Sequence, residues 1–168
     1  MHHTRIVAAL SAAATAVVLS ATLVGCSSAA RSELTLPTAK QQTIAVEKQI
    51  VAYVPADQVT GTDITDKSRV IFPCIGKSGQ SYWPGSTTLK LKNGVDTDAV
   101  LTAIAAHWTN KSGWSAYTNT GSDGNKSLAI KSDSGYSFTV EFDQGPVFSI
   151  NALSGCFANA GLSGNSSY

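Results

Sequence analysis

The stretch from Tyr136 to Asp143 alternates apolar and polar residues, and this pattern constrains the fold more than any other feature of the sequence. A period of two predicts a β-strand with one face in the core and the other in water. Short turns rich in Gly, Asp and Asn divide the last third of the chain into further strands of similar length. We therefore predict an antiparallel meander with strands at 114–119, 127–132, 136–143 and 147–153.

Two helices and two more strands are expected before the meander. Apolar residues recur at helical spacing over 37–53 and again over 97–110, which predicts one helix in each segment. Short apolar runs bounded by turn residues predict strands at 69–75 and 86–92. The polar segment 56–68 lies between the first helix and the first strand, and we expect it to be a loop.

These elements predict an α+β fold, in which two helices pack on one face of a mostly antiparallel sheet of about six strands. The chain has 168 residues, which suits a single domain. Its formal net charge is +1 and the sequence has no basic stripe, which argues against nucleic acid as a partner. We expect the sheet to bury Val70, Phe72, Leu89, Leu91, Phe138, Val140 and Phe148.

The N-terminal segment has the layout of an export signal. Arg5 is followed by an apolar stretch over 6–24, and Leu23-Val24-Gly25-Cys26 closes it. This closing motif resembles the lipobox of bacterial lipoproteins. The resemblance implies that residues 1–25 are a signal peptide and that Cys26 becomes the acylated first residue of the mature chain. Residues 26–36 would then be the lipidated cysteine and a tether.

Two other interpretations of this segment stay open. The apolar stretch reaches roughly 19 residues, about the minimum for an uncleaved membrane helix. Small residues at Ser28-Ala29-Ala30 also suit an ordinary signal peptidase, which would discard Cys26.

The sequence contains three cysteines, and lipidation of Cys26 would leave Cys74 and Cys156. An even remainder in an oxidising, extracytoplasmic compartment suggests one disulfide. Strand parity supports it, because both thiols would point to the core side of their predicted strands. A redox or catalytic cysteine is the alternative, but the sequence has no Cys-x-x-Cys motif.

The mature chain also resembles a group of small actinobacterial lipoproteins of unknown function. The shared marks are a strand ending near Cys74, a helix closed by Gly113-Trp114 and a meander ending near Gly155-Cys156. The resemblance covers roughly residues 37–157 and implies a single α+β domain with Cys74 paired to Cys156. It implies no activity. We expect residues 158–168 to be a flexible tail.

The sequence points to no catalytic residue, no metal site and no cofactor. His107 is the single histidine after the signal segment, at the edge of the apolar stripe of the second helix. We expect it to pack against Trp108, with a role as general base left open. Glu141 and Asp143 lie two residues apart on the wet face of one strand and form a candidate acid/base pair.

Tyr82, Trp83 and Tyr117 are candidates for a binding surface, because aromatic side chains give large, rigid contact area. Trp114 could join them, or it could belong to the core while residues 82–84 anchor a loop. The expected function is non-catalytic binding or assembly at the cell envelope. The alternative is a hydrolase of cell-wall or other glycans.

The expected location is the extracytoplasmic side of the cell membrane, reached through N-terminal acyl chains. A cell-wall glycan or an envelope protein would be the partner.

Overall fold

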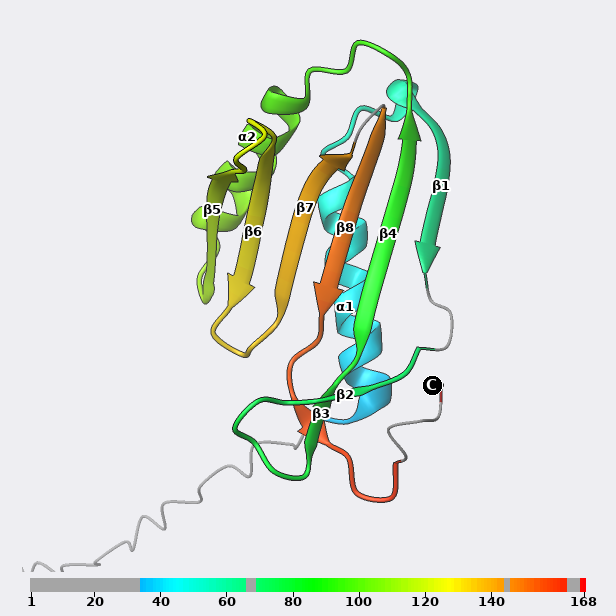
Figure 1. The fold of residues 1–168 in the computed structure, drawn as a ribbon, viewed down its shortest axis with the longest axis vertical. Coiled ribbons are helices and arrows are strands. Elements are labelled where there is room, and N and C mark those ends of the chain that lie inside the picture. Colours follow the sequence, from blue (N-terminus) through cyan, green and yellow to red (C-terminus); the bar gives the residue numbers. More distant parts are fainter. Residues whose placement is uncertain (1–33, 66–68, 144–145, 163–166) are drawn as a thin grey trace, which may run out of the picture. The chain divides into compact units, whose positions relative to one another are not determined.

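The computed structural model describes residues 34–65, 69–143, 146–162 and 167–168. The predicted signal peptide, Cys26 and the tether up to residue 33 lie outside the described residues. Within the described ranges, no helix combines the length and the apolar character that crossing a bilayer requires. Figure 1 shows the α+β fold of the described part.

In chain order the elements are α1 (Leu36–Val51), the short 3-10 helix η1 (Ala56–Gln58), β1 (Val59–Thr65), β2 (Phe72–Pro73), β3 (Gln80–Tyr82), β4 (Pro84–Leu91), α2 (Thr97–Thr109), β5 (Trp114–Thr120), β6 (Lys126–Ser132), β7 (Ser137–Asp143), β8 (Val147–Leu153) and β9 (Phe157–Ala158).

The main sheet has six strands in the order β1-β4-β8-β7-β6-β5, and every neighbouring pair is antiparallel. The four strands β5 to β8 follow each other in space as they do in sequence, which confirms the predicted meander. Strand β4 confirms the strand expected at 86–92, and it separates β8 from the edge strand β1.

Both predicted helices are confirmed to within two residues at each end. Pro37 stands in the first turn of α1, where its missing N–H costs no hydrogen bond. In α2 the carboxylate of Asp96 accepts a hydrogen bond from the backbone N–H of Ala99 at 2.9 Å, as an N-cap should.

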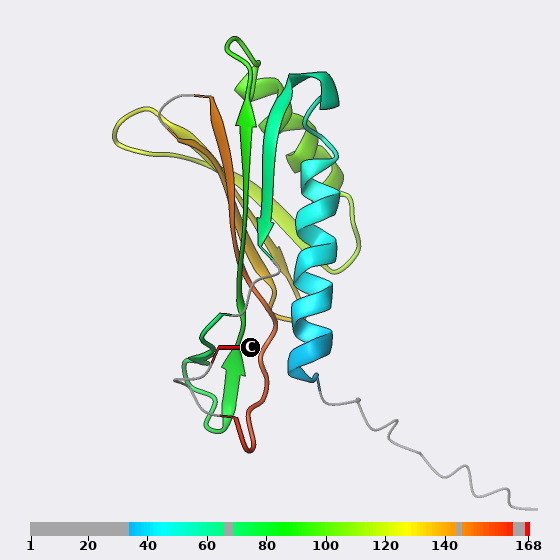
Figure 2. The ribbon, with the colours of Figure 1, turned by 90° about the vertical axis from the view of Figure 1, so that its right-hand side faces the viewer.

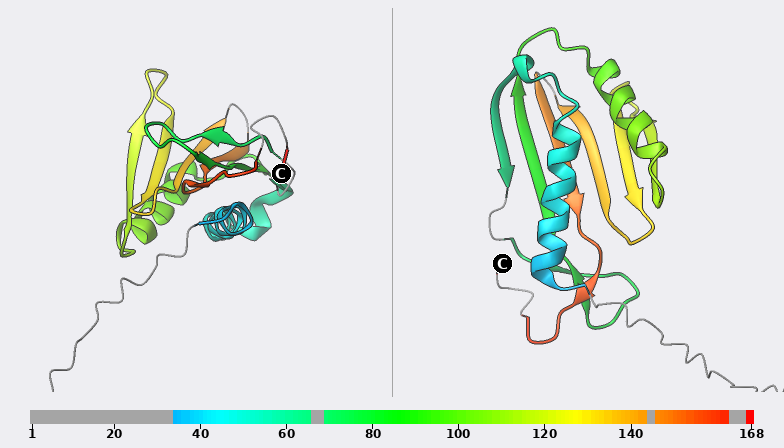
Figure 3. Two further views of the ribbon diagram at one scale, coloured as in Figure 1. Left: turned by 90° about the horizontal axis from the view of Figure 1, so that it is seen from below. Right: turned by 180° about the vertical axis from the view of Figure 1, so that it is seen from behind.

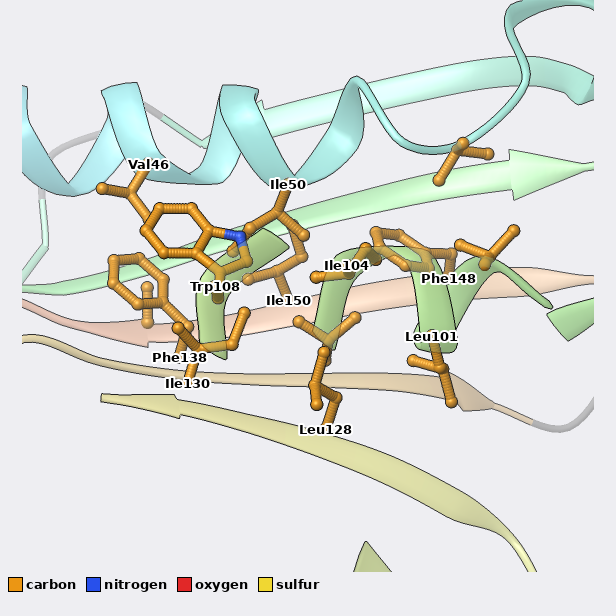
Figure 4. Packing of buried hydrophobic residues seen from close by; sticks show 14 of the residues in the cluster. Val46, Ile50, Leu101, Ile104, Trp108, Leu128, Ile130, Phe138, Phe148 and Ile150 are labelled. Atoms are coloured by element: carbon orange, nitrogen blue, oxygen red, sulfur yellow. The ribbon is translucent and has the colours of Figure 1, made fainter. Parts of the chain in front are cut away.

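The main core joins both helices to the strands of the large sheet (Figure 4). Val46 and Ile50 of α1 and Trp108 of α2 belong to one cluster of buried apolar side chains. The strand residues in this cluster alternate with polar ones, as the period of two predicted. Burial is confirmed for five of the seven expected sheet residues, namely Leu89, Leu91, Phe138, Val140 and Phe148.

For the other two residues, Val70 and Phe72, the expectation of burial is wrong. Val70 is 38% exposed and Phe72 is 46% exposed. The predicted strand at 69–75 shrinks to β2, which pairs with β3 in a separate three-stranded sheet of order β2-β3-β9. Phe72 therefore lies on the small sheet and not on the large one against which the helices pack, and its side chain stays partly exposed.

Strand β1 occupies most of the segment that we expected to be a loop. Its sequence, VTGTDIT, holds two aliphatic residues among polar ones, so no apolar alternation marks it. It pairs with β4 across a register irregularity between Val59 and Gly61. An edge strand needs little apolar character because it contributes few side chains to the core.

The predicted disulfide is confirmed. Cys74 and Cys156 are bonded with a Cα–Cα distance of 6.3 Å, and the bond closes a sequence separation of 82 residues. The parity argument that supported it is not confirmed, because Cys74 is buried whereas Phe72, assigned to the same face, is exposed. The bond connects the segment after β2 to the segment before β9.

A second, smaller core lies under the three-stranded sheet. Its buried members are Ala39, Ile71, Trp83 and Phe157. The described part of the tail, expected to be flexible, makes backbone hydrogen bonds to this region: Asn159 donates its N–H to Gly79 at 3.0 Å. Farther along, the backbones of Tyr168 and Arg69 exchange two hydrogen bonds of 3.0 Å.

Candidate functional site

The structure does not gather the three predicted surface aromatics into one site. Trp83 is fully buried in the smaller core, so its assignment to an exposed surface is wrong. Tyr82 lies on β3, partly buried, and stacks on Phe72 with 5.7 Å between ring centroids. Tyr117 lies on β5 in the other sheet, is 44% exposed and has the Lys131 ammonium 5.5 Å from its ring centroid.

Trp114 packs against the core, whereas His107 is exposed and contacts two aromatic rings of that core cluster. The His107 ring lies 5.3 Å from the Trp108 ring and 5.3 Å from the Tyr53 ring, so the expected contact with Trp108 is present. Trp114 lies 4.5 Å from Trp108 and joins the main cluster, in keeping with the core alternative.

The predicted carboxylate pair on β7 is hydrogen-bonded to the neighbouring strand. Glu141 accepts a hydrogen bond from the Asn151 side chain at 3.1 Å, and Asp143 accepts one from the Ser149 hydroxyl at 2.9 Å. Each carboxylate thus has a partner on β8. In the described part of the chain, no three His, Cys, Asp or Glu side chains come close enough together to hold a metal ion.

Strand β5 is one of the two edge strands of the main sheet. At the two ends of the β5–β6 hairpin, Gly113 accepts from the Asp133 N–H at 2.9 Å and the Gly121 N–H donates to Asn125 at 2.8 Å. In an antiparallel pair every second residue bonds to the partner strand. Odd-numbered residues of β5 therefore face β6, and even-numbered ones turn their backbone groups outward.

Two hydrogen bonds agree with this assignment. The N–H of Trp114 donates to Lys111 at 3.0 Å, and the carbonyl of Ala116 accepts from the Thr109 hydroxyl at 3.4 Å, both outside the β5–β6 ladder. The outward N–H and C=O groups of Thr118 and the outward N–H of Thr120 follow at the far half of the strand. All residues from 117 to 120 are exposed.

The far half of β5, from Tyr117 to Thr120, lacks the devices that usually protect a sheet edge. The sequence of the whole strand, WSAYTNT, has no charged residue and no proline, and all seven of its residues pair regularly with β6. The opposite edge, β1, carries Asp63 and a register irregularity between Val59 and Gly61. A regular, uncharged edge is a template on which an extended segment can add as a further strand.

A buried carboxyl group forms a second unusual feature, and sequence analysis missed it. Glu47 lies on the inner side of α1, is 0% exposed, and accepts a hydrogen bond from the Thr87 hydroxyl at 3.2 Å. Burial raises the pKa of the Glu47 carboxyl from 4.5 to about 7, while the bond from Thr87 and the charge of Arg69 oppose the shift. Its second oxygen, Oε1, has no hydrogen-bond partner among the described residues.

The backbone of Gly85 passes unusually close to the Glu47 carboxyl. A Cβ on Gly85 would lie 2.6 Å from Glu47 Oε1, 3.0 Å from the Trp83 ring and 3.1 Å from the Thr43 methyl group. Arg69, whose charge acts on Glu47, donates to the Ser86 hydroxyl at 2.7 Å. The Glu47 carboxyl is therefore surrounded by atoms of the described residues, which leave no room for a ligand beside it. This favours a structural role for Glu47 over a role in a ligand site.

The spacing of the first helix could have revealed Glu47. Thr43, Glu47 and Ile50 are separated by four and three residues, so all three lie on the stripe that the helix buries. The open edge of β5 had no such signal, because the local sequence of a strand does not determine its position in the sheet.

No protein-family model, curated protein or solved structure matches this chain.

Proposed function

We propose that this chain is a lipid-anchored, extracytoplasmic binding module without catalytic activity, which holds an envelope protein by strand addition to β5. The membrane side of this proposal rests on the lipobox-like Leu23-Val24-Gly25-Cys26. Two or more acyl chains on Cys26 would make the attachment stable, since each buried CH2 contributes about 0.8 kcal/mol.

We also infer that α1 and α2 pack on the same face of the main sheet. Both helices contribute to one apolar cluster with the inward-facing strand residues. Seen from behind, both helices lie in front of the sheet (Figure 3, right). This arrangement leaves the opposite face and the β5 edge available to a partner.

The open half of β5 carries the binding proposal. The outward groups of Thr118 and Thr120 can bond to the backbone of an added strand, which provides affinity without a deep pocket. The exposed ring of Tyr117 lies on the same strand and provides apolar contact for side chains of that segment. A protein partner fits better than a glycan because backbone groups, and not a row of aromatic rings, dominate this edge.

A photo-crosslinking amino acid at Thr120 tests the proposal in cells that express the chain. The matched control places the same group at Thr88, an exposed threonine of β4 away from either sheet edge. A second pair of variants carries the crosslinker at Thr120 together with Thr118→Pro or Thr118→Val. Proline removes one outward N–H, whereas valine keeps it.

We expect one envelope protein to crosslink at position 120, with Thr118→Val and without Thr118→Pro. Equal crosslinking from positions 88 and 120, or no effect of the proline, would contradict strand addition. Recovery of cell-wall glycan in place of protein would replace the proposed partner class.

A further inference from the structure

We propose that the turn between β2 and β3, with Ile75 at its tip, rests on the surface of the membrane that holds the acyl chains. This inference relies on the anchor of the proposed function and adds an orientation: one particular end of the domain faces the lipid.

Ile75 is the most exposed apolar side chain of the described residues. It is 99% exposed, where an isolated soluble domain gains nothing from an aliphatic group. Val70 and Phe72, at 38% and 46% exposure, belong to the same six-residue stretch. Phe72 lies on β2 and Ile75 in the turn that follows, so both exposed apolar side chains belong to the β2–β3 hairpin. Exposed large apolar groups on one hairpin indicate a contact surface.

The turn presents Ile75 in a fixed conformation. Backbone hydrogen bonds run from Lys77 to Cys74 at 3.2 Å, from Gln80 to Lys77 at 3.3 Å and from Cys74 to Gln80 at 3.0 Å. Gly76 supplies the positive φ, +71°, that the turn needs directly after Ile75. The disulfide of Cys74 ties this turn to the rest of the domain.

The chemistry of the turn suits a bilayer. An aliphatic side chain can enter the boundary between headgroups and acyl chains, and the ammonium of Lys77 can stay among anionic headgroups. The combination of an apolar tip and a neighbouring cation suits a lipid surface better than a second protein domain, because a single turn offers little of the area that a protein interface buries.

The first described residues of the chain, which follow the proposed tether, lie at the same end of the domain. Leu34 and Leu36, at the start of α1, pack against the smaller core that supports the three-stranded sheet. Figure 2 shows the start of α1 and this sheet at the lower end of the molecule. Cys26 precedes Leu34 by eight residues (34 − 26), so it reaches at most about 28 Å from Leu34.

Such a short connection makes a weak contact effective. One isoleucine and one lysine would not bind the free domain to vesicles, but a short tether raises the effective concentration of the surface to the millimolar range. The turn therefore orients the anchored domain and does not replace the acyl chains.

Tryptophan fluorescence on anchored protein tests this orientation. The chain from Cys26 to Tyr168 is oxidised, so that Cys74 and Cys156 are paired and the Cys26 thiol can be coupled to a maleimide phospholipid. Coupling places the domain on vesicles of phosphatidylcholine and phosphatidylglycerol independently of any cellular acylation. The reporter is Ile75→Trp, and the matched control is Ser122→Trp, in the exposed turn between β5 and β6.

We expect brominated acyl chains to quench the added emission of Ile75→Trp by about half or more, since such groups insert about 5–10 Å into the boundary region. The emission of Ser122→Trp should stay within the background of the native tryptophans. Equal quenching at both positions, or none at position 75 on coupled protein, would overturn the proposal. A signal that depends on the surface density of protein instead of on bromine would indicate contact between copies and would also overturn it.

The experiment distinguishes a wrong orientation of the turn from a missing lipid anchor. The coupled protein reports the orientation, and the mass of the cellular protein reports the acylation. A third variant, Ile75→Ser, should retain the melting temperature of the parent, because the side chain it removes contacts solvent alone.

Discussion

The hydroxyl of Thr87 on β4 donates a hydrogen bond of 3.2 Å to the carboxyl of Glu47 on α1, inside a fully buried contact between helix and sheet. The pairing places a titratable group where an apolar residue would normally lie. Its protonation should therefore influence the stability of the whole domain.

Replacing Glu47 with Gln should remove a decline in stability with rising pH. The pKa of Glu47 is 4.5 when exposed and about 7 in the fold, so the folded state binds more protons between these values. The stability that Glu47 contributes is then fully present below about pH 4.5, and about 3 kcal/mol of it is lost as the pH rises from there to about 7. Urea unfolding across this pH range measures the slope.

The control for that change is Glu141→Gln on β7, the same substitution at a partly exposed carboxylate. It should leave the slope unaltered. A Glu47→Gln variant that keeps the slope of the parent would show that Glu47 ionises freely in the fold.

Adding a methyl group at Gly85 should destabilise the domain. The new Cβ would lie 2.6 Å from Glu47 Oε1 and 3.0 Å from the Trp83 ring, so neighbouring atoms must move. Overpacking of this kind costs about 1–3 kcal/mol. Thermal unfolding of Gly85→Ala should show the loss, whereas Gly61→Ala should be mild because its nearest neighbour is the Lys90 side chain at 3.7 Å. Similar melting temperatures for both variants would contradict the close approach.

Breaking the disulfide should lower stability substantially. The bond closes a separation of 82 residues, for which chain entropy gives about 4–5 kcal/mol. The double variant Cys74→Ser with Cys156→Ser should unfold at lower denaturant than the parent. Reduction of the parent should reproduce that midpoint, and reduction should leave the double variant unchanged. A parent whose midpoint stays the same after complete reduction would argue against this role.

Proline should destabilise the domain at Tyr117 of β5 and be tolerated at the adjacent Thr118. The N–H of Tyr117 faces β6, so Tyr117→Pro removes a ladder hydrogen bond and should cost about 1 kcal/mol or more. The N–H of Thr118 points outward, so Thr118→Pro should be tolerated, as prolines at sheet edges are. Hydrogen exchange and thermal melting of the two variants would reveal a reversed register as a reversed order of stability.

Long elements with a clear period could be predicted from the sequence. Strand β7 and the helices α1 and α2 each repeat one apolar spacing over seven or more residues, so local pattern and tertiary packing agree. Short elements could not be predicted in this way. Strand β2 has two residues and β9 has two, so neither shows a period, and β9 pairs with β3 across more than 70 residues, as Ser81↔Phe157 shows.

Trp83 and Glu47 show why site prediction was weaker. Flanking Tyr82, Pro84 and Gly85 made Trp83 resemble a loop aromatic, whereas the second sheet and α1 enclose it completely. Glu47 is a charged residue at a buried helical position, which average burial preferences disfavour. In both cases the environment is built by segments distant in sequence.

The intact mass of the protein extracted from cell membranes shows directly whether the domain is lipid-anchored. We expect a chain that begins at Cys26 and carries acyl chains on that residue, with residues 1–25 removed. A chain that begins at Arg31 without lipid, or one that retains residues 1–25, would contradict this expectation.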